Sequence, residues 1–294
     1  MGKLGFQVNF KNEHKASFLA KEIASYYHRG TSLENRIETV LNTLREELGV
    51  KSLKKVDQDV AKAYVDYLRG QVEAGELSRK TAENYLSAFN RVLEYVNDRL
   101  GKNIETFSPK AENLSRGSFE FVDRAVSKET HEKFVSFLSE KQDIRAQALS
   151  HSVGLQREFG LRLRESLAIK EETIREALST GILHLGREDG TKNGREREIP
   201  IRTEEQRQTL EKAYDFMKKN NLFSLAPTTT LREQYNYSYN VAKEFNRETN
   251  ENFHYHGERH AFAQACIAEG VDRQTVSSWL GHGREEITKV YANS

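Results

Sequence analysis

Apolar side chains recur at helical spacing in four consecutive segments of the first hundred residues, and short polar loops separate these segments. The segments run from Glu13 to Tyr27, from Leu33 to Leu48, from about Val60 to Gly75, and from Ser78 to about Val96. Intervals of three and four residues place the apolar side chains on one face of each helix. Such a face must be buried against another helix, and short loops favour antiparallel neighbours. The sequence therefore predicts a helical bundle at the N-terminus.

The helical periodicity fades between Gly101 and Lys128, where Pro109, Gly117 and several Ser and Asn residues occur. This composition is typical of an interdomain linker, which we place at about 101–127. Helices are expected again at 129–139, 144–159, 204–219, 231–248, 257–269 and 273–280. Between the second and third of these, Ile182–Leu185 and Glu198–Ile201 flank a turn-rich segment, which indicates a β-hairpin.

The predicted fold class is therefore mainly α with a small antiparallel β-sheet, in two domains. Residues 1–112 are expected to form the N-terminal helical bundle, and residues 113–294 a mixed α/β domain. A chain of 294 residues is long enough for each domain to bury its own core.

Bulk composition excludes several classes of protein without identifying a partner. Apolar residues make up 37% and charged residues 30% of the chain, which argues against disorder. No stretch reaches the ~18 apolar residues of a membrane span, and no apolar signal segment opens the chain, so we expect a cytoplasmic protein without a membrane partner. The single cysteine, Cys266, excludes an intrachain disulfide. The net charge of +1 does not decide for or against nucleic acid, because binding depends on where the positive charge lies.

Four short segments of the second domain contain the residue types that phosphodiester chemistry requires. They are Gly160–Glu165, Thr191–Gly194, His256–His260 and Leu280–His282, the last followed by Tyr291. Together they supply six candidate site residues: Arg162, Lys192, His256, Arg259, His282 and Tyr291.

A phosphodiester under attack gains negative charge on its non-bridging oxygens. Arginine suits this charge because its planar fork donates two parallel hydrogen bonds and stays protonated, so two arginines can stabilise charge where it develops. A tyrosine phenol, with an ordinary pKa of about 10, needs a base or positive surroundings to become a nucleophile. Lysine or histidine can protonate the departing oxygen. No metal is needed, because the cations are protein groups.

The segment His256–Ala263 resembles the H-x-x-R-H-x-F-A box of the tyrosine recombinase/phage integrase family. Downstream, Leu280–His282, Thr288 and Tyr291 match the family's L-G-H, T and Y at the usual intervals. Upstream, Gly160–Glu165 is similar to the G-L-R-x-x-E box, and Thr191–Gly194 to the β-hairpin that carries the family's lysine. Leu77–Leu86 resembles the last helix of the family's core-binding domain, so the likeness covers most of the chain.

This resemblance implies a site-specific DNA recombinase, an integrase that cleaves and rejoins strands through a 3′-phosphotyrosine intermediate. The expected use is integration or excision of a mobile element. An N-terminal core-binding (SAM-like) DNA-binding domain and a C-terminal catalytic domain would close on double-stranded DNA as a clamp. A homotetramer on synapsed recombination sites, an accessory directionality factor and a nucleoid-associated location when bound to DNA are also implied.

The resemblance also implies roles for the six candidate residues. Arg162 and Arg259 would hold the scissile phosphate, with His256 and His282 completing the cradle. Lys192 would act as general acid for the 5′ oxygen, and Tyr291 would be the nucleophile.

Two other functions stay open. A type IB topoisomerase shares this active-site logic, although the short spacing between the boxes and the core-binding helices favour a recombinase. A DNA-binding regulator that has lost catalysis is the third hypothesis, and the presence of all six candidate residues argues against it.

Individual residues also have alternative interpretations. Arg164 competes with Arg162, and Lys192 lies in a charged turn where a lysine is usually only solvated. His256 and His260 stand four residues apart, which suggests zinc, but the H-E-x-x-H motif places Glu directly after the first His. We interpret His260 as a packing residue and Glu165 as a buried partner of an arginine.

The sequence departs from the family pattern in several places. Phe159 stands where the family usually has Thr, Ser166 stands where it often has Leu, and the chain ends three residues after Tyr291. Many family members continue with a helix that docks on a neighbouring protomer. We therefore expect either a different assembly or a shortened chain, with the cutting chemistry complete.

Overall fold

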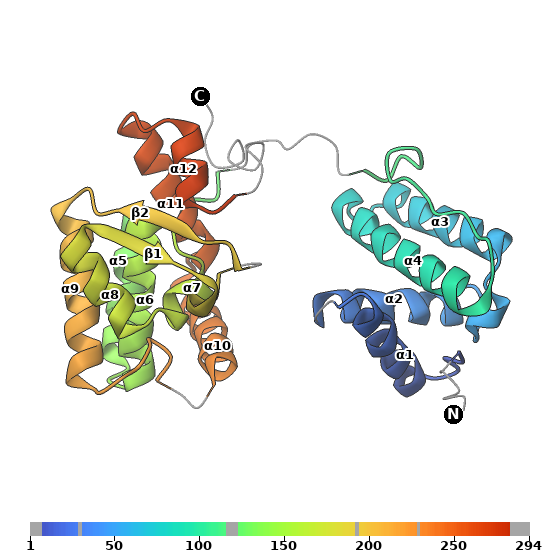
Figure 1. The fold of residues 1–294 in the computed structure, drawn as a ribbon, viewed down its shortest axis with the longest axis horizontal. Coiled ribbons are helices and arrows are strands. Elements are labelled where there is room, and N and C mark those ends of the chain that lie inside the picture. The colour runs from blue at the N-terminus through green and yellow to red at the C-terminus, as the bar shows by residue number, and fades with distance from the viewer. Residues whose placement is uncertain (1–7, 29–30, 116–122, 192–193, 228–229, 283–294) are drawn as a thin grey trace. The chain divides into compact units, whose positions relative to one another are not determined.

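The computed structural model describes residues 8–28, 31–115, 123–191, 194–227 and 230–282. The chain divides into two compact units, Met1–Ser118 and Phe119–Ser294, each with its own core (Figure 1). Helices dominate both units, and an antiparallel pair of strands lies in the second. The predicted fold class, mainly α with a small antiparallel sheet, is confirmed. Within the described ranges no helix is both long enough and apolar enough to cross a lipid bilayer.

Amphipathic helices build the first unit, as their apolar spacing predicts. They are α1 (Glu13–Tyr26), α2 (Thr31–Glu46), α3 (Gln58–Glu73) and α4 (Arg79–Leu100), with a 3-10 turn, η1 (Leu53–Lys55), before α3. Helix α2 packs on α1 and α4, and α3 packs on α4. Tyr64 and Phe89 are buried at the centre, with their ring centroids 4.3 Å apart. Ser78 caps α4 by accepting a hydrogen bond from the Thr81 amide at 3.2 Å, as expected of a serine at this position.

Part of the segment expected to be a linker, 101–127, packs on the helices of the first unit. Ile104 and Leu114 are buried in the first core. The side-chain amide of Asn97 pairs with both the N–H and the C=O of Ile104, at 2.9 and 2.8 Å, and Asn90 pairs in the same way with Phe107 at 3.0 and 2.8 Å. Two asparagines of α4 thus satisfy the backbone polar groups of an extended segment, as a neighbouring strand would.

The second unit is arranged around α6, which packs against α5, α7, α9 and α11. Its elements are α5 (Lys128–Glu140), α6 (Ile144–Phe159), α7 (Leu163–Ala168), α8 (Glu171–Thr180), β1 (Ile182–Leu185), η2 (Arg187–Asp189), β2 (Arg197–Pro200), α9 (Glu204–Lys219), α10 (Leu231–Thr249), α11 (Tyr255–Ala268) and α12 (Arg273–Trp279). Strands β1 and β2 pair antiparallel, with Ile182 opposite Pro200 and Leu185 opposite Arg197. The predicted hairpin is confirmed, although β2 begins one residue earlier than expected.

Helices α7 and α8 lie where the apolar periodicity indicates none. Helix α7 has six residues, too few for a repeating pattern, and α8 buries only Ile174 and Ala177. Short helices of this kind are fixed by the surrounding packing and not by their own propensity. Helix α7 follows Arg162 directly, so it positions the first candidate site residue.

Candidate active site

Arg259 is the buried centre of the site. It lies in α11 and is fully buried. Its guanidinium donates to the carbonyl of Gly160 at 2.6 Å and to the carbonyl of Leu280, and it approaches His282 Nε2 at 3.1 Å. A carbonyl oxygen orients a guanidinium without cancelling its charge. Arg259 therefore ties together three of the sequence segments singled out above while keeping its positive charge.

Gly160 is required where α6 ends, for two independent reasons. Its φ is +62°, which disfavours any residue with a side chain. A Cβ added here would also lie 2.5 Å from a ring carbon of Phe262 and 2.8 Å from a methyl group of Leu280. Phe262 follows Arg259 on α11, and Leu280 precedes His282. The glycine thus allows the three segments to approach closely enough for Arg259 to join them.

Arg162 is held by a buried carboxylate that it shares with a third arginine. Glu165 is fully buried and accepts from the Arg162 guanidinium and the Arg162 amide, each at 2.7 Å. Arg197, on β2 and 6% exposed, donates to both oxygens of Glu165 at 3.1 and 2.6 Å. Burial alone would raise the pKa of Glu165, but the hydrogen bonds and charge of Arg197, with those of Arg162, lower that pKa to about 2. The expectation that Glu165 is a structural partner of an arginine is confirmed.

Both candidate histidines are held in the neutral form. The pKa of His282 is lowered to about 3, first by burial and then by the charges of Arg259 and Arg162. Because an arginine only donates, the contact with Arg259 makes His282 Nε2 the acceptor, which is also the neutral form. The pKa of His256 is lowered to about 3 as well, by the protein atoms crowded around it and by His260, Arg259 and Arg162. His256 is nevertheless exposed to solvent, so it lies at the open side of the site.

A second buried carboxylate anchors the first turn of α11. Glu258 stands between His256 and Arg259 in sequence and is fully buried. It accepts from Arg157 of α6 at 3.1 Å and contacts His131 Nδ1 of α5 at 3.0 Å. These contacts attach the turn that carries the candidate residues to two other helices.

Four of the six predicted site residues come together in the structure. Arg162, His256, Arg259 and His282 lie close enough for their charges to act on one another, and they come from three separate parts of the chain. Arg164, the competitor of Arg162, is exposed and does not contribute to the pKa shift of either histidine. Lys192, Thr288 and Tyr291 lie outside the described residues.

His256 and His260 pack against each other and do not form part of a metal site among the described residues. His260 is buried, and its ring packs edge-on against that of His256 with centroids 5.0 Å apart. In the part of the chain that the structure describes, no three His, Cys, Asp or Glu side chains group together as metal ligands would. The packing role expected for His260 is confirmed by its burial.

Arg197 contributes to the site although the sequence boxes do not include it. It occupies an inward position of β2, two residues before the buried Ile199, and the intervening Glu198 is exposed. Because side chains alternate between the two faces of a strand, a charged residue in phase with a buried isoleucine indicates a buried ionic partner. That alternation was the available signal, and the charged surroundings of the hairpin obscured it.

The model of the phage integrase family matches residues 124–294, which is more than half of the chain. The chain belongs to the phage integrase family. Family membership makes it a tyrosine-type site-specific recombinase, an enzyme of DNA strand exchange, as its sequence boxes predict. A search of curated protein sequences returns no match.

Solved structures share the fold along almost the whole chain. An integrase of transposon Tn1549, in complex with transposon right-end DNA, is 18% identical with a TM-score of 0.61, covering 95% of each chain. The XerH site-specific recombinase bound to its difH substrate is 17% identical with a TM-score of 0.63, covering 96% of this chain and 81% of that one. A lambda integrase from a tetramer bound to a Holliday junction is 14% identical with a TM-score of 0.60, covering 94% and 76%. At these identities the likeness concerns the fold of the family.

Proposed function

We propose that this recombinase cuts and rejoins duplex DNA at specific sites, with Tyr291 as nucleophile, to integrate or excise a mobile element. Arg162 and Arg259 bind the scissile phosphate, and His256 and His282 complete its cradle. Lys192 supplies the proton for the leaving oxygen.

One observation carries this proposal. Two arginines and two histidines meet at one place, where burial first, and the charges of Arg259 and Arg162 after it, lower both imidazole pKa values far below the usual range. Such a site repels further positive charge and stabilises an anion. A phosphodiester whose charge increases in the transition state fits these donors better than a neutral substrate does.

The chemistry balances without a cofactor. The phenolate oxygen of Tyr291 attacks phosphorus, and the bond from phosphorus to the 5′ oxygen breaks. That oxygen takes a proton from Lys192 and leaves as a hydroxyl, while the DNA 3′ phosphate stays on the tyrosine. A 5′ hydroxyl from another strand reverses the steps, so the energy of the phosphodiester is conserved in the protein–DNA bond.

Duplex DNA is the proposed partner of both units. We assign the first unit as the core-binding domain, because Leu77–Leu86, at the start of α4, resembles that domain's last helix. A homotetramer on two synapsed sites follows from strand exchange between two duplexes, and relatives solved on DNA include a tetramer on a Holliday junction. An accessory directionality factor would choose between integration and excision.

The test begins by finding the site. Covalent protein–DNA complexes recovered from cells are digested, and the attached DNA is sequenced. A duplex of that sequence with a nick beside the cleavage position is then incubated with the protein. The short 5′-terminal fragment diffuses away after cleavage, so a covalent adduct should accumulate, and it should be absent with Tyr291→Phe.

The same assay separates the alternatives. DNA binding without any adduct would leave only the regulatory protein. Relaxation of supercoiled DNA of any sequence would indicate a type IB topoisomerase.

A further inference from the structure

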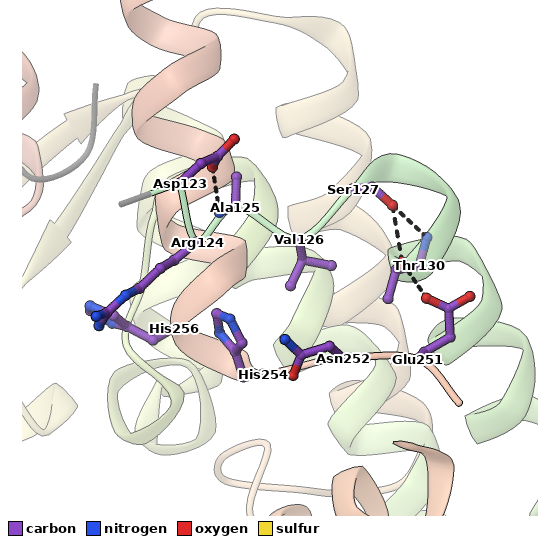
Figure 2. A pocket seen from close by; sticks show the side chains of 10 residues that line it. All are labelled: Asp123, Arg124, Ala125, Val126, Ser127, Thr130, Glu251, Asn252, His254 and His256. Atoms are coloured by element: carbon purple, nitrogen blue, oxygen red, sulfur yellow. Dashed lines mark hydrogen bonds between the residues drawn. The ribbon is translucent and has the colours of Figure 1, made fainter. Parts of the chain in front are cut away.

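An open hollow of about 710 Å³ lies beside His256 in the second unit (Figure 2). Its wall includes Arg124, His254 and Asn252. In Figure 2 the side chains of Arg124 and His256 extend toward the same side of this hollow. The hollow therefore adjoins the site assigned to the scissile phosphate.

The backbone next to Arg124 is held against the first turn of α11. The amide of Val126 donates to the carbonyl of Gly257 at 3.2 Å, in the first turn of α11. A Cβ added at Gly257 would lie 2.5 Å from Val126 and 2.7 Å from the carbonyl oxygen of Arg124. Segment 124–126 therefore lies directly on the helix that carries His256 and Arg259, and this packing leaves the Arg124 side chain exposed.

The two acidic residues of the hollow have partners of their own. Asp123 accepts from the Ala125 amide at 3.0 Å and from Gln264 at 2.9 Å. Glu251 accepts from Lys133 and from Thr130, each at 2.8 Å. Among the described residues, no hydrogen bond or ion pair engages the Arg124 guanidinium. Its charge instead acts on His254 and His260, whose pKa values lie below the usual range because of burial and then of Arg124.

We propose that this hollow is a second phosphate subsite, in which Arg124 binds the DNA backbone phosphate next to the scissile one. His254 and Asn252 face the same phosphate from the loop before α11. Arg124 has no counter-ion among the residues that the structure describes, and it is anchored beside the cleavage centre. Its guanidinium offers the bidentate donor pair that a phosphate accepts. The inference rests on the proposed function, because it names a further contact to the same DNA.

The first test measures salt dependence and needs no target site. The Tyr291→Phe protein, which is expected to bind but not to cut, is titrated onto a labelled duplex of about 30 base pairs at about 50 and about 200 mM KCl. Arg124→Ala in this background should bind about tenfold more weakly at the lower salt concentration. Loss of one phosphate contact should make the plot of log K, the association constant, against log salt concentration less steep by about 0.9. The affinity difference between the parent and Arg124→Ala should therefore shrink about 3.5-fold between the lower and the higher salt concentration.

Matched variants separate a specific contact from general charge. Arg124→Lys keeps the charge and should keep most of the slope. Arg175→Ala removes the same charge from an exposed residue of α8 that is paired with Glu172, outside the hollow, and should leave the slope unchanged. An equal change of slope in Arg124→Ala and Arg175→Ala would overturn the inference. The exposed position of Arg124 predicts an unchanged melting temperature, which checks that the variant is folded.

A second measurement locates the phosphate on the recovered site. Each backbone phosphate near the cleavage position is replaced in turn by a neutral methylphosphonate. Arg124→Ala should abolish the affinity loss at one position next to the scissile phosphate and keep the loss at the scissile phosphate itself. If Arg124→Ala still loses affinity at every substituted position, the second phosphate subsite is contradicted and the proposed function is not. If the parent protein binds no DNA at all, the proposed function itself is contradicted.

Discussion

Arg197 gives the sharpest test of how the site is held, because it was not expected from the sequence and contacts no substrate in the proposed mechanism. It donates two hydrogen bonds to Glu165, which is fully buried and also holds Arg162. The Arg197 stem additionally packs against the loop before His282, since a Cβ on Gly281 would lie 3.2 Å from its Cδ. Arg197→Met removes the charge and keeps much of the stem.

The expected loss of stability in Arg197→Met follows from the buried carboxylate of Glu165. The pKa of Glu165 is about 2, well below the ordinary 4.5 of a glutamate, although burial alone would raise it. A net shift of this size corresponds to about 3 kcal/mol, and the contacts with Arg197, Arg162 and the backbone together exceed that figure because they also offset the effect of burial. Removing one partner of a buried ion pair costs about 3–5 kcal/mol, because the other charge stays buried. We therefore expect Arg197→Met to lower the free energy of unfolding of the second unit by about 3 kcal/mol at pH 7.

The assay uses the single tryptophan. Trp279, at the end of α12, is the only one in the chain and belongs to the second unit. Its fluorescence during urea unfolding therefore follows that unit without a contribution from the first. Glu165→Gln should also be destabilising. The double variant Arg197→Met with Glu165→Gln should recover at least half of the summed loss, because neither fully buried charge is then left without the other, and only the partly exposed Arg162 loses its carboxylate.

Activity distinguishes positioning from stability. Under conditions where the variants remain folded, Arg197→Met should slow adduct formation. Without Arg197, Glu165 competes more strongly with the scissile phosphate for the Arg162 guanidinium. Arg197→Lys, which keeps a charge but not the fork, should be intermediate. A stability loss below about 1 kcal/mol, or additive single and double variants, would refute the account of a shared buried carboxylate.

Two further predictions concern the same unit. Gly160→Ala should lower the free energy of unfolding by about 3 kcal/mol, because overlap with Phe262 adds to the backbone strain. Gly181 also has a positive φ, +78°, but open space around it, so Gly181→Ala should lower that free energy by only about 1 kcal/mol. Equal urea midpoints for the two variants would contradict the argument that Gly160 allows a close approach. Burial lowers the pKa of His260 to about 4, so the unfolded chain binds more protons below its ordinary pKa of 6.5, and stability present above that value is lost progressively as the pH falls toward 4. The share of His260 in this loss is about 2 kcal/mol between pH 7.5 and pH 5, and His256 and His282, whose pKa values are also lowered, add to it. His260→Leu should therefore reduce the pH dependence of stability by about 2 kcal/mol over this range, and an unchanged slope would count against it.

The sequence predicted those features that depend on local repetition. Apolar spacing located the long helices, and alternation around the turn-rich segment located the hairpin. Ser78 marked the start of α4 because a helix N-terminus needs a side-chain acceptor. The order of the short boxes brought Arg162, Arg259 and His282 into one hypothesis before any geometry was known.

The features that the sequence did not predict depend on tertiary contacts. Segment 101–115 was interpreted as a linker because its polar residues hide its role, and only the pairing of Asn90 and Asn97 with its backbone shows why it packs on α4. Helices α7 and α8 are too short or too sparsely apolar to have a period. Arg197 and Glu165 are 32 residues apart, and a buried pair at that separation has no signature in local spacing.

The identity of the nucleophile is the central claim, and peptide mapping of the covalent complex tests it most directly. The adduct formed on the recovered site is digested with nuclease and protease, and the peptide that carries the residual nucleotide is sequenced by mass spectrometry. The account predicts a 3′-linked nucleotide on Tyr291. A nucleotide on any other residue, or an adduct that persists in Tyr291→Phe, would contradict it.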